Sequence, residues 1–154
     1  MITGRPVWIG DMISTDDISP THAFTTDPEK IRESCNLHRL VIGPEISDVD
    51  GMKGTVIIAG TEFGWGSYRE SAALCIKYLG VKAVIAESFG FGMYRNLINL
   101  GIPAFTGYIP PKPYENIVID FDNMVAIFGG EKYELQMSDV ARRILEHGGL
   151  MNVL

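Results

Sequence analysis

The chain has 154 residues, of which 46% are hydrophobic and 21% are charged, as expected of one ordinary globular domain covering residues 1–154. Its formal net charge of -6 argues against a nucleic-acid-binding role, because such proteins present a basic face to the phosphate backbone. No apolar run approaches the ~18 residues of a membrane span, and the N-terminus lacks the apolar stretch of a signal peptide, so we expect no membrane association and a cytoplasmic location.

The first third of the chain predicts few regular elements. Residues 6–10 form a short apolar run typical of a strand, and residues 11–20, dense in acids and hydroxyls, are expected to be a loop. A helix is predicted over 27–34, with Asp27 as its N-cap and proline at its first helical position. Residues 43–54 are polar and rich in Gly and Asp, which again indicates a loop.

The middle of the chain alternates between strands and helices. Connections of this length imply a parallel sheet with right-handed crossovers. The predicted strands cover 55–60, 81–87 and 102–106, and the predicted helices cover 67–79 and 93–100.

The last third changes character and predicts an antiparallel section. Three short apolar segments are separated by turn residues, and Ser138 is placed to cap a final helix that Gly148 ends. The three segments are 117–121, 124–128 and 132–137. The fold class expected is α/β, with a parallel α/β core and an added antiparallel β section.

The two cysteines, Cys35 and Cys75, lie far apart and show no metal-ligand spacing. Cys75 falls within an apolar run and is predicted to lie in the core, whereas Cys35 precedes a polar stretch and could be a surface thiol. Two cysteines are too few for an iron–sulfur cluster, which takes four ligands, or three when one iron stays open.

The segment E-F-G-W-G-S-Y-R-E, residues 62–70, places a serine at the junction of a strand and a helix. One hypothesis is a capping box, in which Ser67 accepts from the amide of Glu70 and Glu70 reaches back. The other is a carboxylate-binding corner, because the glycines permit close backbone approach and Arg69 offers a planar fork of donors. A hydrolase nucleophile is disfavoured, since Arg69 stands where G-x-S-x-G requires glycine.

Three stretches, 10–20, 59–73 and 82–103, together resemble the swivelling domain of the aconitase superfamily. They read G-D-M-I-S-T-D-D-I-S-P, A-G-T-E-F-G-W-G-S-Y-R-E-S-A-A and K-A-V-I-A-E-S-F-G-F-G-M-Y-R-N-L-I-N-L-G-I-P. The size of the chain is similar to that of the small subunits of isopropylmalate dehydratase (isopropylmalate isomerase, an enzyme of leucine biosynthesis) and of homoaconitase-type enzymes. The resemblance implies a swivelling β/β/α domain.

The resemblance also implies a hydro-lyase that removes water from a 2-hydroxy di- or tricarboxylate and adds it back. Ser67 would take the proton, Arg69 would grip a substrate carboxylate, and Asp16 and Gly66 would line the same site. The [4Fe-4S] cluster, whose open iron acts on the leaving hydroxyl, would belong to a separate large subunit, with no cofactor or metal on this chain. We therefore expect the chain to need that partner and to be inactive alone. In isolation it could form homo-oligomers.

Several residues depart from the family pattern. Tyr68 stands where a second small hydroxyl is usual. It could bind substrate, by narrowing the pocket or replacing the missing hydrogen bond, or it could point away onto the helix surface. Phe91 stands where the family often has arginine in S-F-A-R-I. In the loop after I-S-P, His22 could replace an arginine as a titratable cation and Phe24 could line an apolar subpocket, although a surface histidine and a core phenylalanine are equally open. The alternatives are therefore a homoaconitase-like, alkylmalate or methylcitrate-type dehydratase subunit, or a non-catalytic anion-binding relative.

The acidic residues Asp11, Asp16 and Asp17 raise a further alternative, a Mg²⁺ or Ca²⁺ site. Their spacing does not match that of an EF-hand loop, so a metal role for them is disfavoured.

Overall fold

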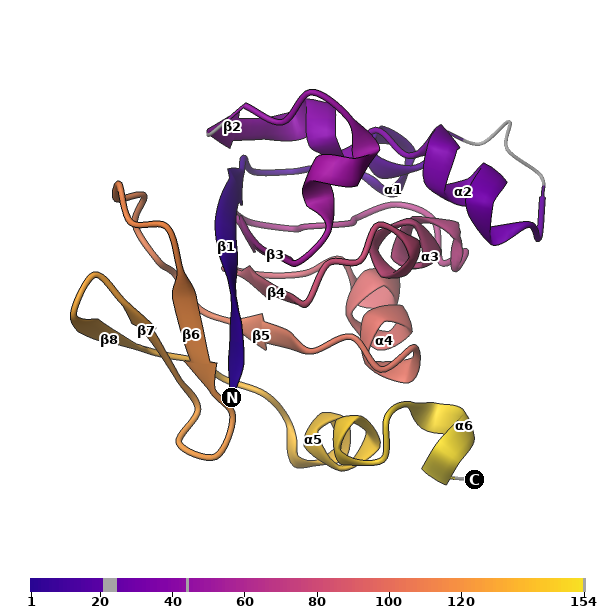
Figure 1. Ribbon diagram of the computed structural model, residues 1–154. Coiled ribbons are helices and arrows are strands. Elements are labelled where there is room, and N and C mark those ends of the chain that lie inside the picture. The colour runs from indigo at the N-terminus through magenta and orange to yellow at the C-terminus, as the bar shows by residue number, and fades with distance from the viewer. Residues whose placement is uncertain (21–24, 44, 154) are drawn as a thin grey trace.

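A computed structural model describes residues 1–20, 25–43 and 45–153 of the chain (Figure 1). Its strands form one eight-stranded sheet in the spatial order β5-β4-β3-β1-β6-β7-β8, in which β2 pairs with β1. The strands are β1 (Ile2–Ile9), β2 (Val41–Gly43), β3 (Thr55–Ala59), β4 (Ala83–Ala86), β5 (Ala104–Thr106), β6 (Ile117–Asp120), β7 (Val125–Phe128) and β8 (Glu131–Glu134).

Strand β1 joins two differently built parts of the sheet. Its residues 5–9 pair in parallel with β3, and β4 and β5 continue the parallel part. Its residues 2–4 pair antiparallel with β6, which continues through β7 and β8 as an antiparallel meander. The predicted α/β fold with an added antiparallel section is therefore confirmed.

The helices lie on one side of the parallel strands, and the β6–β8 meander lies on the other (Figure 1). Successive residues of β3 face opposite ways: Ile57 packs in the core beneath the helices, whereas Val56 and Ile58 pack against the meander. Burial on both faces explains why the parallel strands read as continuous apolar runs. The helices are α1 (Thr15–Ile18), α2 (Pro28–Ser34), α3 (Ser71–Tyr78), α4 (Phe91–Asn99), α5 (Asp139–Glu146) and α6 (Leu150–Val153), with 3₁₀ turns η1 (Leu37–Leu40) and η2 (Val49–Met52).

Within the described ranges, no helix has the length and apolarity that crossing a bilayer requires.

Most predicted elements are confirmed, and their caps with them. Asp27 accepts from the amide of Glu29 at the start of α2, and Ser138 accepts from the amide of Ala141 at the start of α5. Three details are wrong. The segment 11–20 contains the short helix α1, residues 43–54 include η2, and the helix predicted from residue 67 begins at Ser71.

Cys35 and Cys75 are joined in a disulfide that ties the end of α2 to the middle of α3. Cys75 is buried, as predicted, but Cys35 is only 1% exposed, so the prediction of a surface thiol is wrong. The pairing could not be found from spacing, because it is set by the packing of α2 on α3 across a sequence separation of 40 residues.

Loss of this disulfide is expected to lower the free energy of unfolding by about 3–4 kcal/mol, because a cross-link spanning 40 residues restricts the unfolded chain. Guanidinium unfolding of oxidised protein, of reduced protein and of the double variant Cys35→Ala/Cys75→Ala checks this. Reduced protein separates the effect of the cross-link from that of the cavity left by alanine. Equal midpoints for oxidised and reduced protein would contradict the expectation.

Candidate functional site

Three loops meet where the parallel strands β1, β3 and β4 end at their carboxyl termini. The loops cover residues 10–18, 60–70 and 87–90. Main-chain hydrogen bonds join them: the amide of Gly64 donates to the Ile13 carbonyl (2.6 Å), and that of Phe63 to the Ser88 carbonyl (3.0 Å). Ligands of open α/β sheets bind at this edge, so the loops form the candidate site.

Ser67 lies in the middle loop, and its hydroxyl is hydrogen-bonded to Arg69. Its Oγ accepts from the main-chain amide of Arg69 (3.0 Å) and from the Arg69 Nε (3.0 Å), and it remains partly exposed. The predicted capping box is wrong, because Glu70 is the N-cap of α3 and makes no side-chain capping bond. Two donors aimed at one oxygen, one of them cationic, stabilise negative charge on that oxygen.

The backbone of these loops is held in uncommon conformations. Gly64 has φ of +76° and Gly66 has φ of +112°, so the close turns that the glycines predicted are present. Met12 and Glu62 also adopt positive φ, at 55° and 52°, although neither is glycine. Such residues persist where the surrounding structure over-determines them, and they gather at functional sites.

The loop 10–18 supports Ser67 from the other side through Thr15. The amide of Ser67 donates to Thr15 Oγ1 (3.1 Å), and the amide of Thr15 donates to the carbonyl of Trp65 (2.9 Å). A capping box between Ser14 and Asp17 starts α1 and orients Thr15. Sequence reasoning missed this box, although S-T-D-D carries its S-x-x-[DE] signature.

Asp16 is exposed and directly follows Thr15, whose side chain accepts from the Ser67 amide. Asp16 therefore lies in the same corner as Ser67 and Arg69. Its carboxylate forms no hydrogen bond or ion pair with residues in the described ranges. Of the other acids in this loop, Asp17 accepts from the amide of Ser14, and Asp11 accepts from the amide of Thr61. Asp16 is therefore the acid in this loop with a carboxylate left for a ligand.

Replacing Thr15 by valine is expected to raise the mobility of the Ser67 loop and to destabilise the chain by about 1–3 kcal/mol. Valine keeps the shape but removes the oxygen that accepts from the Ser67 amide, and Thr15 is 5% exposed. Amide hydrogen exchange at residues 64–70 and thermal unfolding measure the two effects. Thr15→Ser, which keeps the oxygen, is the matched control. Unchanged exchange in Thr15→Val would contradict the expectation.

Tyr68 packs on the first turn of α4. Its ring lies 6.3 Å from that of Phe91 in a T-shaped arrangement. Its carbonyl accepts from the side-chain amide of Asn96 (3.1 Å), which also reaches the Arg69 carbonyl (3.5 Å). Asn96, in the R-N pair of the sequence, thus ties α4 to the Ser67 loop.

No histidine in the described ranges forms a hydrogen bond with Ser67. His38 lies in η1 with its ring buried, and burial lowers its pKa below the usual range. His147 ends α5, where its Nδ1 contacts the carbonyl of Arg143 (2.9 Å). The predicted site residue His22, and Phe24 beside it, lie outside the described residues.

A pocket of about 380 Å³ adjoins the Ser67 loop at the start of α4. Tyr94, Arg95 and Ser88 contribute polar groups to its lining. Burial raises the pKa of Tyr94 above its usual range, against the opposing effect of hydrogen bonds with Ser138, so its hydroxyl stays protonated at neutral pH.

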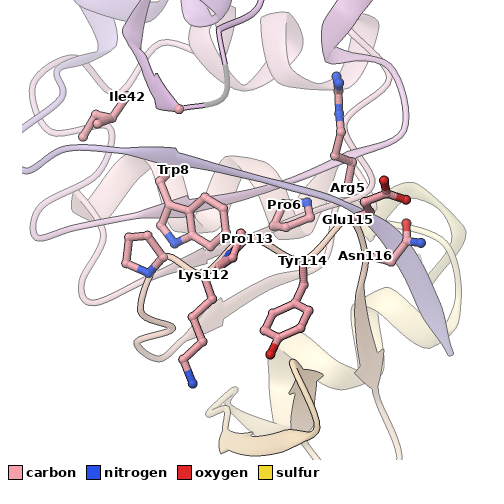
Figure 2. A pocket seen from close by; sticks show the side chains of 11 residues that line it. Arg5, Pro6, Trp8, Ile42, Lys112, Pro113, Tyr114, Glu115 and Asn116 are labelled. Atoms are coloured by element: carbon pink, nitrogen blue, oxygen red, sulfur yellow. The ribbon is translucent and has the colours of Figure 1, made fainter.

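A larger pocket of about 820 Å³ lies elsewhere, over β1, β2 and residues 111–116 (Figure 2). Trp8, Pro6 and Tyr114 supply most of its apolar wall, and Arg5 and Lys112 extend from it (Figure 2). None of its lining residues belongs to the three loops around Ser67. Size alone therefore does not identify the candidate site.

The described part of the chain does not fit a metal cluster. It contains no group of three His, Cys, Asp or Glu side chains arranged to hold a metal ion, and both cysteines are bonded to each other. The aspartates of the 10–18 loop are included in this result, so a Mg²⁺ or Ca²⁺ site there has no support.

Comparison with known proteins gives a family match over two of the three loops of the site, 60–70 and 87–90. The model of the aconitase C-terminal domain matches residues 48–105, which include Ser67, Arg69 and Phe91.

Curated relatives match over nearly the whole chain. The small subunit of a methanogen homoaconitase from Methanocaldococcus jannaschii is 37% identical, covering 100% of this chain and 91% of that protein. The 3-isopropylmalate dehydratase small subunit of Pyrobaculum islandicum is 37% identical over 99% of this chain and 96% of its own length. A protein of the same name from Saccharolobus islandicus is 36% identical over 100% and 94%.

A solved structure shares the fold. The crystal structure of 3-isopropylmalate dehydratase from Methanocaldococcus jannaschii superposes with a TM-score of 0.83 at 34% identity, covering 98% of this chain and 91% of that one.

Proposed function

Because the chain belongs to the aconitase-type family of 3-isopropylmalate dehydratase and homoaconitase small subunits, we propose that it is the small subunit of a 3-isopropylmalate dehydratase. It works there as one part of a hydro-lyase that moves water between neighbouring carbons of a 2-hydroxy acid. The observation that carries the proposal is the Ser67 hydroxyl, which accepts two N–H bonds from Arg69 at the carboxyl edge of the sheet.

In this proposal Ser67 removes the proton from the carbon next to the one that loses its hydroxyl. A serine hydroxyl is a very weak acid whose pKa lies far above neutral pH, so its ionised form must be stabilised by the site. The amide and Nε of Arg69, both 3.0 Å from Oγ, stabilise the alkoxide form. Closure of the site against a partner subunit would exclude water and strengthen both interactions.

Arg69 has a second role that its geometry permits. Its Nε is bonded to Ser67 Oγ, which leaves the two terminal amino groups of the guanidinium for a substrate carboxylate. The same residue thus holds the substrate next to the base. Asp16 and the main chain of Gly66 complete the corner on this reading.

The iron–sulfur cluster of the enzyme is assigned to the large subunit, because the described residues of this chain do not fit it. The name "small subunit", which the curated relatives carry, supports such a partner. This chain's part in the reaction is therefore limited to holding the substrate and moving one proton.

The chain alone is expected to show no turnover, and addition of a cluster-loaded large subunit is expected to restore it. In this proposal the group that acts on the leaving hydroxyl belongs to the large subunit, so activity should rise with large-subunit concentration and saturate. Steady-state assays of each subunit and of mixtures measure this. Turnover by the purified small subunit would contradict the division of labour.

A homoaconitase-type subunit is the second candidate, favoured by the 37% identity to the small subunit of that name. The reconstituted enzyme would be assayed with 3-isopropylmalate, other alkylmalates and hydroxytricarboxylates. A kcat/KM for 3-isopropylmalate that exceeds the others supports the first candidate, and a preference for a tricarboxylate supports the second.

A further inference from the structure

The 380 Å³ pocket beside the Ser67 loop contains an arginine that the reaction described so far does not use. Ser88 follows the end of β4, and Thr106 ends β5. Because β3, β4 and β5 are parallel neighbours, the pocket lies at the same edge of the sheet as Ser67, which follows β3.

The wall of this pocket touches the Ser67 loop directly. The amide of Gly90 donates to the carbonyl of Phe63 (2.8 Å), and a Cβ on Gly90 would lie 2.6 Å from the Cα of Trp65. Only glycine permits this approach. The pocket and the Ser67 hydroxyl are thus carried by adjoining segments of the chain.

Arg95 brings a positive charge to the pocket. Its guanidinium carbon lies 4.9 Å from the centre of the Phe91 ring, and within the described ranges it forms no ion pair. Arg142 stacks on Phe121 at the same distance, 4.9 Å, but pairs with Asp122 and Glu146. The charge of Arg142 is satisfied within the chain, whereas that of Arg95 is available to an anion.

Tyr68 and Phe91, the two described residues that depart from the family pattern, contact each other beside this pocket. The ring of Tyr68 packs on Phe91, and a Cβ at Gly92 would lie 2.8 Å from Cδ1 of Tyr68, so glycine at 92 makes room for the tyrosine. Phe91 stands where an arginine is usual, and Arg95 lies on its ring one turn later in α4. Arg95 therefore places a positive charge beside the ring that stands at the arginine position.

We propose that Arg95, held in place by Phe91, binds the second carboxylate of the substrate in this pocket. The inference deepens the proposed function and rests on it: a hydroxy diacid would be held by Arg69 at one carboxylate and by Arg95 at the other. Arg95 supplies the positive charge of the pocket. The Ser88 hydroxyl is neutral and donates to the Glu62 carboxylate (3.4 Å). Phe91 is a positioning residue that acts through Arg95.

The test uses the reconstituted two-subunit enzyme with Arg95→Met and Arg95→Lys. Loss of a charge-assisted bond predicts a rise in KM of about 10- to 100-fold for Arg95→Met, with a much smaller change in kcat, and a smaller rise for Arg95→Lys. Phe91→Leu is expected to raise KM, and Phe91→Tyr, which keeps the ring, is expected to restore it. Arg142→Met is the matched control and leaves KM unchanged.

A pair of unreactive inhibitors tests the charge directly. Wild-type enzyme is expected to bind succinate, a dicarboxylate, more tightly than butyrate, its four-carbon monocarboxylate counterpart. Arg95→Met is expected to remove most of this preference, because it lowers the affinity for succinate and leaves the affinity for butyrate unchanged. If Arg95 had a purely structural role, Arg95→Met would lower the affinity for both inhibitors to the same extent.

Two results would overturn the inference: unchanged KM and inhibitor preference in Arg95→Met, or a loss of affinity for the large subunit in place of the KM effect. Ser67→Ala, measured in parallel, separates this failure from that of the proposed function. If Ser67→Ala is inactive while Arg95→Met keeps the wild-type KM and inhibitor preference, the hydro-lyase role is supported and the Arg95 subsite is wrong. If Ser67→Ala remains active, the proposed function itself falls.

Discussion

Replacing Ser67 by alanine is expected to lower kcat of the reconstituted enzyme by about 10²–10⁴-fold, the usual contribution of a positioned base. Alanine removes the oxygen that accepts from the amide and Nε of Arg69, and no histidine in the described ranges is hydrogen-bonded to Ser67. Steady-state kinetics at saturating substrate, together with gel filtration of the complex, measure the effect and confirm assembly.

Ser47→Ala is the matched control for this experiment. Ser47 is exposed in the segment before η2, away from the three loops, so its replacement should leave both kcat and assembly unchanged. Thermal unfolding of Ser67→Ala should stay close to wild type, since among the described residues the hydroxyl is hydrogen-bonded only to the neighbouring Arg69. Near-normal turnover by Ser67→Ala would reduce Ser67 to a residue that shapes the turn.

Replacing Arg69 by lysine is expected to lower kcat/KM by about 10²–10³-fold, the usual loss for one donor to a developing oxyanion. Lysine keeps the positive charge but lacks the Nε that donates to Ser67 Oγ, and it cannot grip a carboxylate with a planar fork. The main-chain amide bond to Oγ remains, so some activity should survive.

The separate kcat and KM values of Arg69→Lys distinguish its two roles. A fall in kcat reports loss of alkoxide stabilisation, and a rise in KM reports weaker carboxylate binding. Arg143→Lys, on the exposed surface of α5, is the control. A variant with both constants within a few-fold of wild type would contradict both roles.

The regular elements of this fold were predictable because their signals are local. Asp27 before proline marks α2, Ser138 marks α5, and the apolar runs of β3 and β4 mark strands buried on two faces. The start of α3 was not predictable, since Ser67 has a better donor in Arg69 than in the amide of Glu70.

The site could be predicted only in part, for a related reason. Ser67 and Arg69 are neighbours in sequence, so their association was visible, whereas Thr15 reaches the Ser67 amide across 52 residues. The Cys35–Cys75 disulfide likewise depends on how α2 packs on α3. Contacts of this kind follow from tertiary packing and leave no trace in short-range spacing.

The three loops at the sheet edge are fastened to one another mainly through peptide groups, as at Gly64–Ile13, Phe63–Ser88 and Gly90–Phe63. Every amino acid except proline brings the same peptide N–H and carbonyl, so, apart from positions that require glycine such as Gly90, this scaffold depends little on the side chains it displays. Selection for a new substrate can therefore exchange residues such as Tyr68 and Phe91 while the proton-transferring corner keeps its shape. A framework built this way favours evolutionary diversification of specificity at little risk to the chemistry.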